Sequence, residues 1–149
     1  MGLREQLMAD LKEAMRAGDD VRKSTIRMVR AAIVNAEKEE GATELTEGDI
    51  QRVVAQQAKQ RRDAIAEFEK AGREDLVAKE RAELAILMAY LPRQLTEEEI
   101  EAAARAKIEE VGATTMAQMG DVMRPLMAEL GERADGRLVG QVVRRLLSQ

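Results

Sequence analysis

Apolar residues recur every three or four positions through almost the whole of this 149-residue chain, and this spacing limits the possible folds more than any other feature. The first such series is Leu3, Leu7, Leu11 and Met15. Positions with this spacing fall on one face of an α-helix, where they can pack against a core. No run alternates apolar and polar residues with the period of two that a half-buried strand shows. The sequence therefore predicts an all-α fold with no sheet.

Glycine and threonine mark the ends of the predicted helices. Glycine readily adopts the left-handed conformation that follows the last helical turn, and five glycines follow helical runs: Gly18, Gly41, Gly72, Gly112 and Gly131. Three threonines stand three residues before a side chain that can complete a capping box: Thr46, Thr96 and Thr115. These signals predict helices at about 3–17, 20–40, 47–71, 73–91, 97–111, 116–130 and 137–148.

A proline divides these helices into two groups. Pro92 cannot continue a helix and disfavours helical backbone at the residue before it, so the fourth helix must end by Leu91. We expect an N-terminal lobe of about four helices (1–91), a linker (92–95) and a smaller C-terminal lobe of about three helices (96–149).

The chain contains no cysteine and no histidine, and Phe68 and Tyr90 are its only aromatic residues. Disulfides, thiolate nucleophiles, imidazole bases and the usual Cys or His metal sites are therefore excluded. The first residues lack the apolar run of a signal peptide, and no stretch approaches the roughly 18 apolar residues of a membrane span. We expect a cytoplasmic protein without catalytic residues, metal, cofactor or membrane contact.

The charges are unevenly distributed along the chain. The net charge is −4, but residues 1–36 carry seven Lys or Arg against five Asp or Glu, and residues 115–149 carry five against four. The middle, residues 37–114, carries twelve against nineteen. Because salt screens charges beyond about 8–10 Å, an acidic protein can still present a basic face to phosphate. Strong non-specific binding is not expected, and neither is a DNA partner.

Arg61 interrupts the apolar stripe of the third predicted helix, and Glu80 interrupts that of the fourth. A hairpin between the two helices would bring Arg61 opposite Glu80 and Glu83, where an ion pair would offset the cost of burying these charges. We predict this structural ion pair. The alternative is that Arg61, together with Lys59 and Arg62, faces a phosphate.

Several residues are unusual for the predicted C-terminal helices. Pro125 removes a backbone hydrogen bond, which predicts a kink near Asp121 or a split into two short helices. Gly120 and Gly140 each cost a helix about 1 kcal/mol relative to alanine. Either a tight helix crossing or the approach of a nucleic-acid backbone would explain them. A methionine series either fills the core or lines a peptide groove: Met116, Met119, Met123 and Met127.

Six short motifs follow one another along the chain: Lys59-Gln60-Arg61-Arg62-Asp63; Ala71-Gly72-Arg73 with Asp75-Leu76; Glu80 with Glu83-Leu84; Tyr90-Leu91-Pro92; Met119-Gly120 with Val122-Met123; and Gly131 with Arg133-Ala134-Asp135-Gly136. In this order they resemble the YqeY family, small bacterial proteins similar to the C-terminal tail of the GatB component of the aspartyl/glutamyl-tRNA amidotransferase. The resemblance covers nearly the whole chain. It implies a helical fold and an association with tRNA, because that tail helps to hold the tRNA body.

The stretch most similar to the tail is 119–123, followed by the 131–136 loop and the last helix. The resemblance therefore implies RNA contacts at Gly120, Arg124, Arg133, Arg137, Arg144 and Arg145. Arginine suits such contacts because its planar guanidinium can bond two phosphate oxygens at once. The alternative for Arg144 and Arg145 is a solvated helix face. The sequence contains no counterpart of the catalytic portion of GatB, no GxxxxGK[ST] phosphate loop and no Ser-Lys amidase arrangement.

Three functions follow as hypotheses. The first is a non-catalytic helical module that binds tRNA backbone and shape in translation, since scarce aromatic residues argue against stacking on unpaired bases. The second is a protein adaptor that docks on the tRNA amidotransferase or an aminoacyl-tRNA synthetase complex through its acidic N-terminal lobe. The third is a part of a carbon–nitrogen ligase that uses glutamine as amido donor. Without cysteine or histidine to supply an activated nucleophile, autonomous activity is not expected.

Overall fold

The computed structural model describes residues 2–39, 41 and 43–149. Its elements are α1 (Leu3–Ala17), α2 (Asp20–Glu39), α3 (Glu47–Lys70), α4 (Glu74–Met88), α5 (Glu97–Val111), η1 (Met116–Gln118), α6 (Met119–Leu130), η2 (Gly131–Arg133) and α7 (Gly136–Leu147), where η marks a short 3-10 helix. No strand occurs among the described residues, so the predicted all-α fold is confirmed. No helix in this part of the chain is both long enough and apolar enough to cross a membrane.

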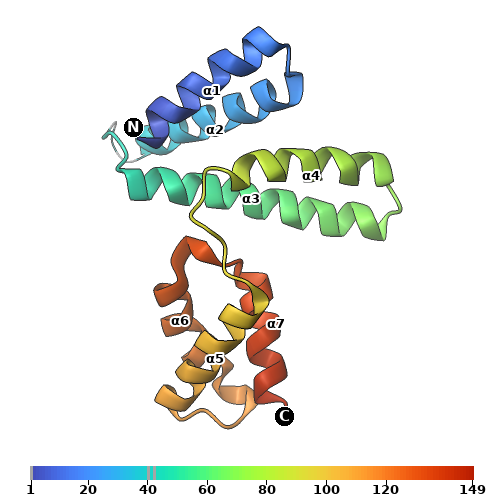
Figure 1. Ribbon diagram of the computed structural model, residues 1–149. Coiled ribbons are helices and arrows are strands. Elements are labelled where there is room, and N and C mark those ends of the chain that lie inside the picture. The colour runs from blue at the N-terminus through green and yellow to red at the C-terminus, as the bar shows by residue number, and fades with distance from the viewer. Residues whose placement is uncertain (1, 40, 42) are drawn as a thin grey trace. The chain divides into compact units, whose positions relative to one another are not determined.

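The chain divides into two compact units, Met1–Leu91 and Pro92–Gln149. The first unit contains α1 to α4, arranged as an α1–α2 hairpin and an α3–α4 hairpin (Figure 1). The second contains α5, α6 and α7, each of which packs against the other two. The α-helices of the described residues are therefore distributed as four and three, in agreement with the fold predicted from the sequence.

The predicted helix boundaries are set by local caps. Thr46 and Thr96 begin α3 and α5 with complete capping boxes, in which the threonine hydroxyl accepts from the third helical amide and an acidic side chain accepts from the threonine amide. Gly18 and Gly112 end α1 and α5 in the left-handed conformation, with φ of 68° and 76°. The other three predicted glycine stops also have positive φ. The glycine and threonine signals are confirmed at these positions, except that Gly131, with ψ of −134°, lies outside the left-handed helical region.

The helix boundaries near the two prolines differ from the predicted ones. Helix α4 ends at Met88, earlier than the ring of Pro92 alone would require. Helix α6 runs without interruption through Pro125, and the break in the predicted 116–130 helix falls earlier, where η1 gives way to α6 at Met119. The predicted split near Asp121 does not occur, and a change of helix type is found at Met119 instead.

Residues 92–95, predicted as a linker, contact the second unit. The Leu95 amide donates a 2.8 Å hydrogen bond to the Arg133 carbonyl, and Gln94 Nε2 donates one of 2.8 Å to the Glu132 carbonyl. These bonds hold the segment before α5 against the end of α6.

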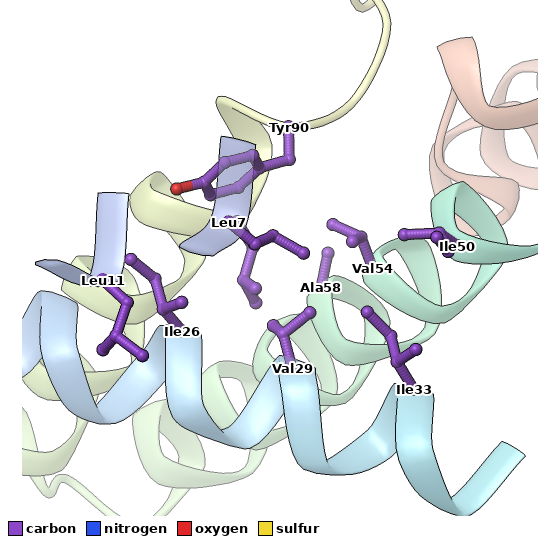
Figure 2. Packing of buried hydrophobic residues seen from close by; sticks show 10 residues of the cluster. Leu7, Leu11, Ile26, Val29, Ile33, Ile50, Val54, Ala58 and Tyr90 are labelled. Atoms are coloured by element: carbon purple, nitrogen blue, oxygen red, sulfur yellow. The ribbon is translucent and has the colours of Figure 1, made fainter. Parts of the chain in front are cut away.

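All four helices of the first unit contribute to its core (Figure 2). The buried members are Leu7 and Leu11 from α1, Ile26, Val29 and Ile33 from α2, Ile50, Val54 and Ala58 from α3, and Leu87 and Tyr90 from the end of α4 and the turn after it. Full burial of such a side chain contributes about 1.5–3 kcal/mol. Met15, which was predicted to share the α1 stripe, is 52% exposed, and Ala14 is buried instead. A spacing of four advances about 40° per step around a helix, so the series has left the core face by its fourth member.

The second unit has a separate core built around α5, α6 and α7. Its buried residues are Ile100, Ala104, Ala113, Val122, Leu126, Leu130, Val139, Val142, Val143 and Leu147. The valines and leucines of α7 fill one side of that helix completely, which leaves its charged residues on the opposite side.

Tyr90 joins the end of α4 to α1. Its hydroxyl donates a 2.5 Å hydrogen bond to Asp10 Oδ2, while an Arg22 guanidinium nitrogen of α2 lies 3.5 Å from Asp10 Oδ1. The tyrosine side chain is almost fully buried. This burial, followed by the hydrogen bond to the Asp10 carboxylate, raises the pKa of Tyr90 well above its usual range. The cluster fixes three helices at one point.

Tyr90→Phe is expected to lower the free energy of unfolding at pH 7 by about 1.5–3 kcal/mol, the usual contribution of a hydrogen bond to a charged group. The natural protein holds the phenol proton to higher pH when folded than when unfolded. The contribution of Tyr90 to the free energy of unfolding is therefore fully present below about pH 10 and is lost as the pH rises past that value. The variant should not show this loss. Urea titrations at pH 7 and about pH 10.5 measure both effects. Equal stability of the two proteins at pH 7 would contradict this role for Tyr90.

Candidate nucleic-acid interface

Helices α6 and α7 meet along a row of methionine side chains. A methyl group placed on Gly140 would lie 3.7 Å from Met119 Cε and 3.9 Å from Met123 Cε, and one placed on Gly136 would lie 3.7 Å from Met127 Cε. The three methionines are partly buried against the core of the second unit. These five residues are termed the methionine seam.

The packing of these methionines distinguishes between the two interpretations of the methionine series. Met119, Met123 and Met127 pack on the core, as the core-filling interpretation predicts. Met116 differs, since it is 41% exposed and its sulfur lies 3.6 Å from Ser148 Oγ near the end of α7. Flexible thioether side chains suit this contact because they adapt to irregular gaps between helices.

Four of the predicted RNA contacts border the methionine seam. Side chains three or four positions apart are neighbours on a helix surface. By this spacing Gly120 and Arg124 lie beside the seam on α6, and Arg137 and Arg144 lie beside it on α7. All four residues are exposed. The fold therefore brings them to the two sides of one helix–helix contact.

Two of these arginines are available to an external anion. The guanidinium groups of Arg124 and Arg144 make no hydrogen bond or ion pair with any residue that the structure describes. Each therefore keeps its five N–H donors for a ligand. The Arg137 amide donates to Asp135 Oδ1 at 3.4 Å, in the cap that begins α7.

The other two predicted arginines are engaged within the second unit. Arg133 donates from Nε to the Leu130 carbonyl and from a terminal nitrogen to the Glu129 carbonyl, both at 3.2 Å, and so caps the end of α6. Arg145 forms ion pairs with Glu97 at 3.1 Å and Glu101 at 3.2 Å, which join α7 to α5. Both side chains therefore have partners within the second unit, and their RNA contacts stay a prediction.

Gly120 has no packing role inside the second unit. A Cβ atom added there would meet nothing within 4 Å, and the residue lies exposed near the start of α6. The tight-crossing interpretation is therefore wrong for Gly120. For Gly140 the neighbours are flexible methionine ends at ordinary contact distance, so close backbone packing does not require glycine there either. The approach of a nucleic-acid backbone to Gly120 stays a prediction.

Gly120→Ala is expected to leave the free energy of unfolding unchanged or to raise it by up to about 1 kcal/mol, because alanine favours the helix and meets no obstacle. Gly112→Ala provides the control. It places a side chain at φ 76° and should destabilise the protein by about 1–2 kcal/mol. Thermal and urea unfolding of the two variants measure the difference. A destabilised Gly120→Ala protein would show that this glycine has an internal role.

Arg61 lies in the interior of the first unit between α3 and α4. Its side chain is 6% exposed, and its Nε lies 3.4 Å from Glu83 Oε2 and 4.0 Å from Glu80 Oε2. One terminal nitrogen donates to Gln57 Oε1 at 3.0 Å. Burial, followed by the neighbouring Glu83 carboxylate, raises the pKa of Glu80. The buried position leaves Arg61 no access to an external phosphate.

A groove between α1 and α2 was not predicted from the sequence. It has a volume of about 540 Å³, and Lys12, Arg16 and Arg30 line it. The spacing of Lys12 and Arg16 by one helical turn was visible in the sequence, but their proximity to Arg30 depends on the hairpin. Among the described residues, no group of three or more His, Cys, Asp or Glu side chains could hold a metal ion.

These features define a class of small, all-helical proteins built from two units, with exposed arginines beside a helix seam in the second. The chain belongs to the YqeY family. The family model described as Yqey-like protein matches residues 4–147, a range that includes most of both units. The resemblance seen in the sequence motifs is thereby confirmed.

Several curated fungal proteins are similar to this chain, and each is named altered inheritance of mitochondria protein 41, mitochondrial. The protein of Kluyveromyces lactis is 48% identical over 84 residues, which cover 56% of this chain and 45% of the relative. That of Eremothecium gossypii is 39% identical over 100 residues, covering 67% and 55%. That of Pyrenophora tritici-repentis is 32% identical over 138 residues, covering 93% and 67%. The chain spans about half the length of the first two relatives.

The predicted cytoplasmic location is contradicted by these relatives, whose names point to mitochondria. The prediction used the absence of cysteine and of a signal peptide. Those features separate oxidising from reducing compartments but do not distinguish the cytosol from an organelle. The cytoplasmic prediction is therefore wrong.

Proposed function

We propose that this protein binds tRNA through the arginines beside the methionine seam. The observation that carries the proposal is the presence of Arg124 and Arg144 on the two helices of the seam, exposed and without a hydrogen-bond or ion-pair partner among the described residues. Exposed guanidinium groups without an internal partner can bind phosphate oxygens by charge-assisted hydrogen bonds. The similarity to the amidotransferase tail supports tRNA as the nucleic acid.

Recognition rests on phosphate positions and the shape of the folded RNA. The second unit contains no aromatic residue, since Phe68 and Tyr90 both belong to the first. Stacking on splayed bases, the usual basis of single-strand recognition, therefore has no platform there. Exposed Gly120, with open space around its Cα, allows the RNA backbone to approach the start of α6 closely.

A pull-down from cell lysate with and without ribonuclease tests this function. The full chain carries an affinity tag, and the bound RNA and protein are identified together. A tRNA signal that ribonuclease removes would support the proposal. Recovery of the tRNA amidotransferase or a synthetase in both samples, without tRNA, would instead favour the adaptor. Ammonia release from glutamine by the purified chain would favour a role in a carbon–nitrogen ligase.

A further inference from the structure

Helices α1 and α2 form a groove with an apolar floor on the surface of the first unit. Leu7 and Ile33 are buried at its base, while Met8 and Val34 line it with exposed fractions of 36% and 46%. The volume of about 540 Å³ can receive several side chains of a partner. Apolar surface that stays open to water in this way commonly marks a binding site.

The charged side chains around the groove are mostly basic, and three of them have no carboxylate partner among the described residues. Lys12, Arg16 and Arg30 line it, and none of them forms a hydrogen bond or ion pair with a described residue. Arg4 lies at the same groove but is already paired at 2.7 Å with a carboxylate of α2. Among the described lining residues, Glu5 is the only acidic one. The groove therefore has a positive rim.

Exposed cations elsewhere in the same unit are often neutralised by neighbouring carboxylates. Examples are Lys59 with Asp63 at 3.0 Å, Lys70 with Glu67 at 3.4 Å and Arg81 with Glu69 at 2.6 Å. The three unneutralised cations beside an apolar floor are thus complementary to negative charge that the described part of this unit does not supply. Complementary charge of this kind selects a partner and speeds its association.

We propose that this groove binds an acidic amphipathic helix of a protein partner. Such a helix would place apolar side chains, at positions i, i+3 or i+4 and i+7, on the floor that includes Met8 and Val34. Its Asp and Glu residues would face Lys12, Arg16 and Arg30. Methionine at the surface suits this contact because its flexible thioether adapts to the side chain that enters.

The α1 wall of the groove is lined from Arg4 to Arg16, which is about 18 Å or three turns of helix. A partner helix of a few turns can lie along it. RNA phosphates would bind the cations but gain nothing from the apolar floor, which is why a protein helix fits better. The surface differs from the acidic docking face expected for an adaptor, because here the partner carries the negative charge.

Photo-crosslinking from the groove tests this proposal. Benzoylphenylalanine replaces Val34 in the full chain, expressed in cells, and the crosslinked partner segment is sequenced by mass spectrometry. One protein segment with helically spaced apolar residues and Asp or Glu between them is expected. Crosslinks to RNA, to lipid, to a second copy of this chain, or to segments without that pattern would overturn the proposal.

A synthetic peptide of the captured segment then allows the charges to be tested. Lys12→Glu is expected to weaken its binding by about tenfold or more, because the change sets like charges against each other. Lys79→Glu, on α4, is the matched control, since Lys79 is also exposed and makes no hydrogen bond or ion pair with a described residue. Equal weakening by both changes would contradict the groove as the site. Binding of tRNA is measured in parallel, so that this proposal and the proposed tRNA function can fail separately.

Discussion

Glu83→Leu is expected to lower the free energy of unfolding of this protein by about 3 kcal/mol, the size of effect seen when one partner of a buried ion pair is removed. The change removes the carboxylate nearest to Arg61, at 3.4 Å, and leaves Glu80, at 4.0 Å, as the one described carboxylate that faces this almost completely buried guanidinium. The Arg61 Nε already lacks a hydrogen-bond partner, so the site has little capacity to compensate.

A second substitution in the same chain tests whether the loss of stability comes from the unpaired charge of Arg61. Arg61→Met together with Glu83→Leu should recover most of the loss, because apolar residues then replace both charges. Arg81→Met is the control: its 2.6 Å pair with Glu69 also joins α3 to α4 but is exposed, and its loss should cost less than about 1 kcal/mol. Urea unfolding compares all three proteins. If Glu83→Leu is no more destabilising than the control, the buried pair does not hold the hairpin together.

The second large effect concerns RNA. Arg124→Glu combined with Arg144→Glu is expected to weaken tRNA binding by about 100-fold, since each lost charge-assisted hydrogen bond corresponds to roughly a tenfold change in affinity. The salt dependence should also become shallower, by about one unit of slope for each phosphate contact removed. Both side chains are exposed and make no bond to a described residue, so folding should not change.

Lys12→Glu combined with Lys79→Glu is the matched control for the arginine pair. It alters the net charge equally, but on the first unit. Filter binding or fluorescence anisotropy with a folded tRNA transcript measures both proteins. Equal weakening by the two pairs would mean that net charge, rather than the methionine seam, determines binding.

The helices could be predicted closely because their boundaries depend on local chemistry. Thr46 and Thr96 cap helices through residues three positions away, and Gly112 ends α5 through its own backbone. The end of α4 was less predictable. Its last turn gives way at Met88, and Tyr90 just beyond contacts Asp10, 80 residues earlier in the chain. Contacts over such a separation leave no periodic signal.

The site could be predicted only in part for the same reason. The sequence shows that Arg144 and Arg145 are adjacent, but not that Arg145 meets Glu97 and Glu101 of α5 while Arg144 bonds to no described residue. Likewise, nothing local indicates that Arg133 caps the end of α6. Dividing the six candidate residues into four beside the methionine seam and two that bond within the second unit required the packing of α5, α6 and α7.

The α1–α2 groove is the feature that the sequence predicted least. Its floor and rim combine residues of α1 with Ile33, Val34 and Arg30 of α2, and only the hairpin brings the two series together. The lack of carboxylate partners for its cations also depends on tertiary structure, because ion pairs such as that of Arg81 with Glu69 form between helices.

The central claim, that this chain binds tRNA through phosphate contacts, is tested most directly by equilibrium binding of the purified full chain to a folded tRNA transcript at several salt concentrations. We expect the logarithm of the affinity to fall linearly with the logarithm of the salt concentration. The slope should correspond to at least two contacts, at about −0.7 to −0.9 for each phosphate. No binding, or an affinity that does not change with salt, would contradict the claim.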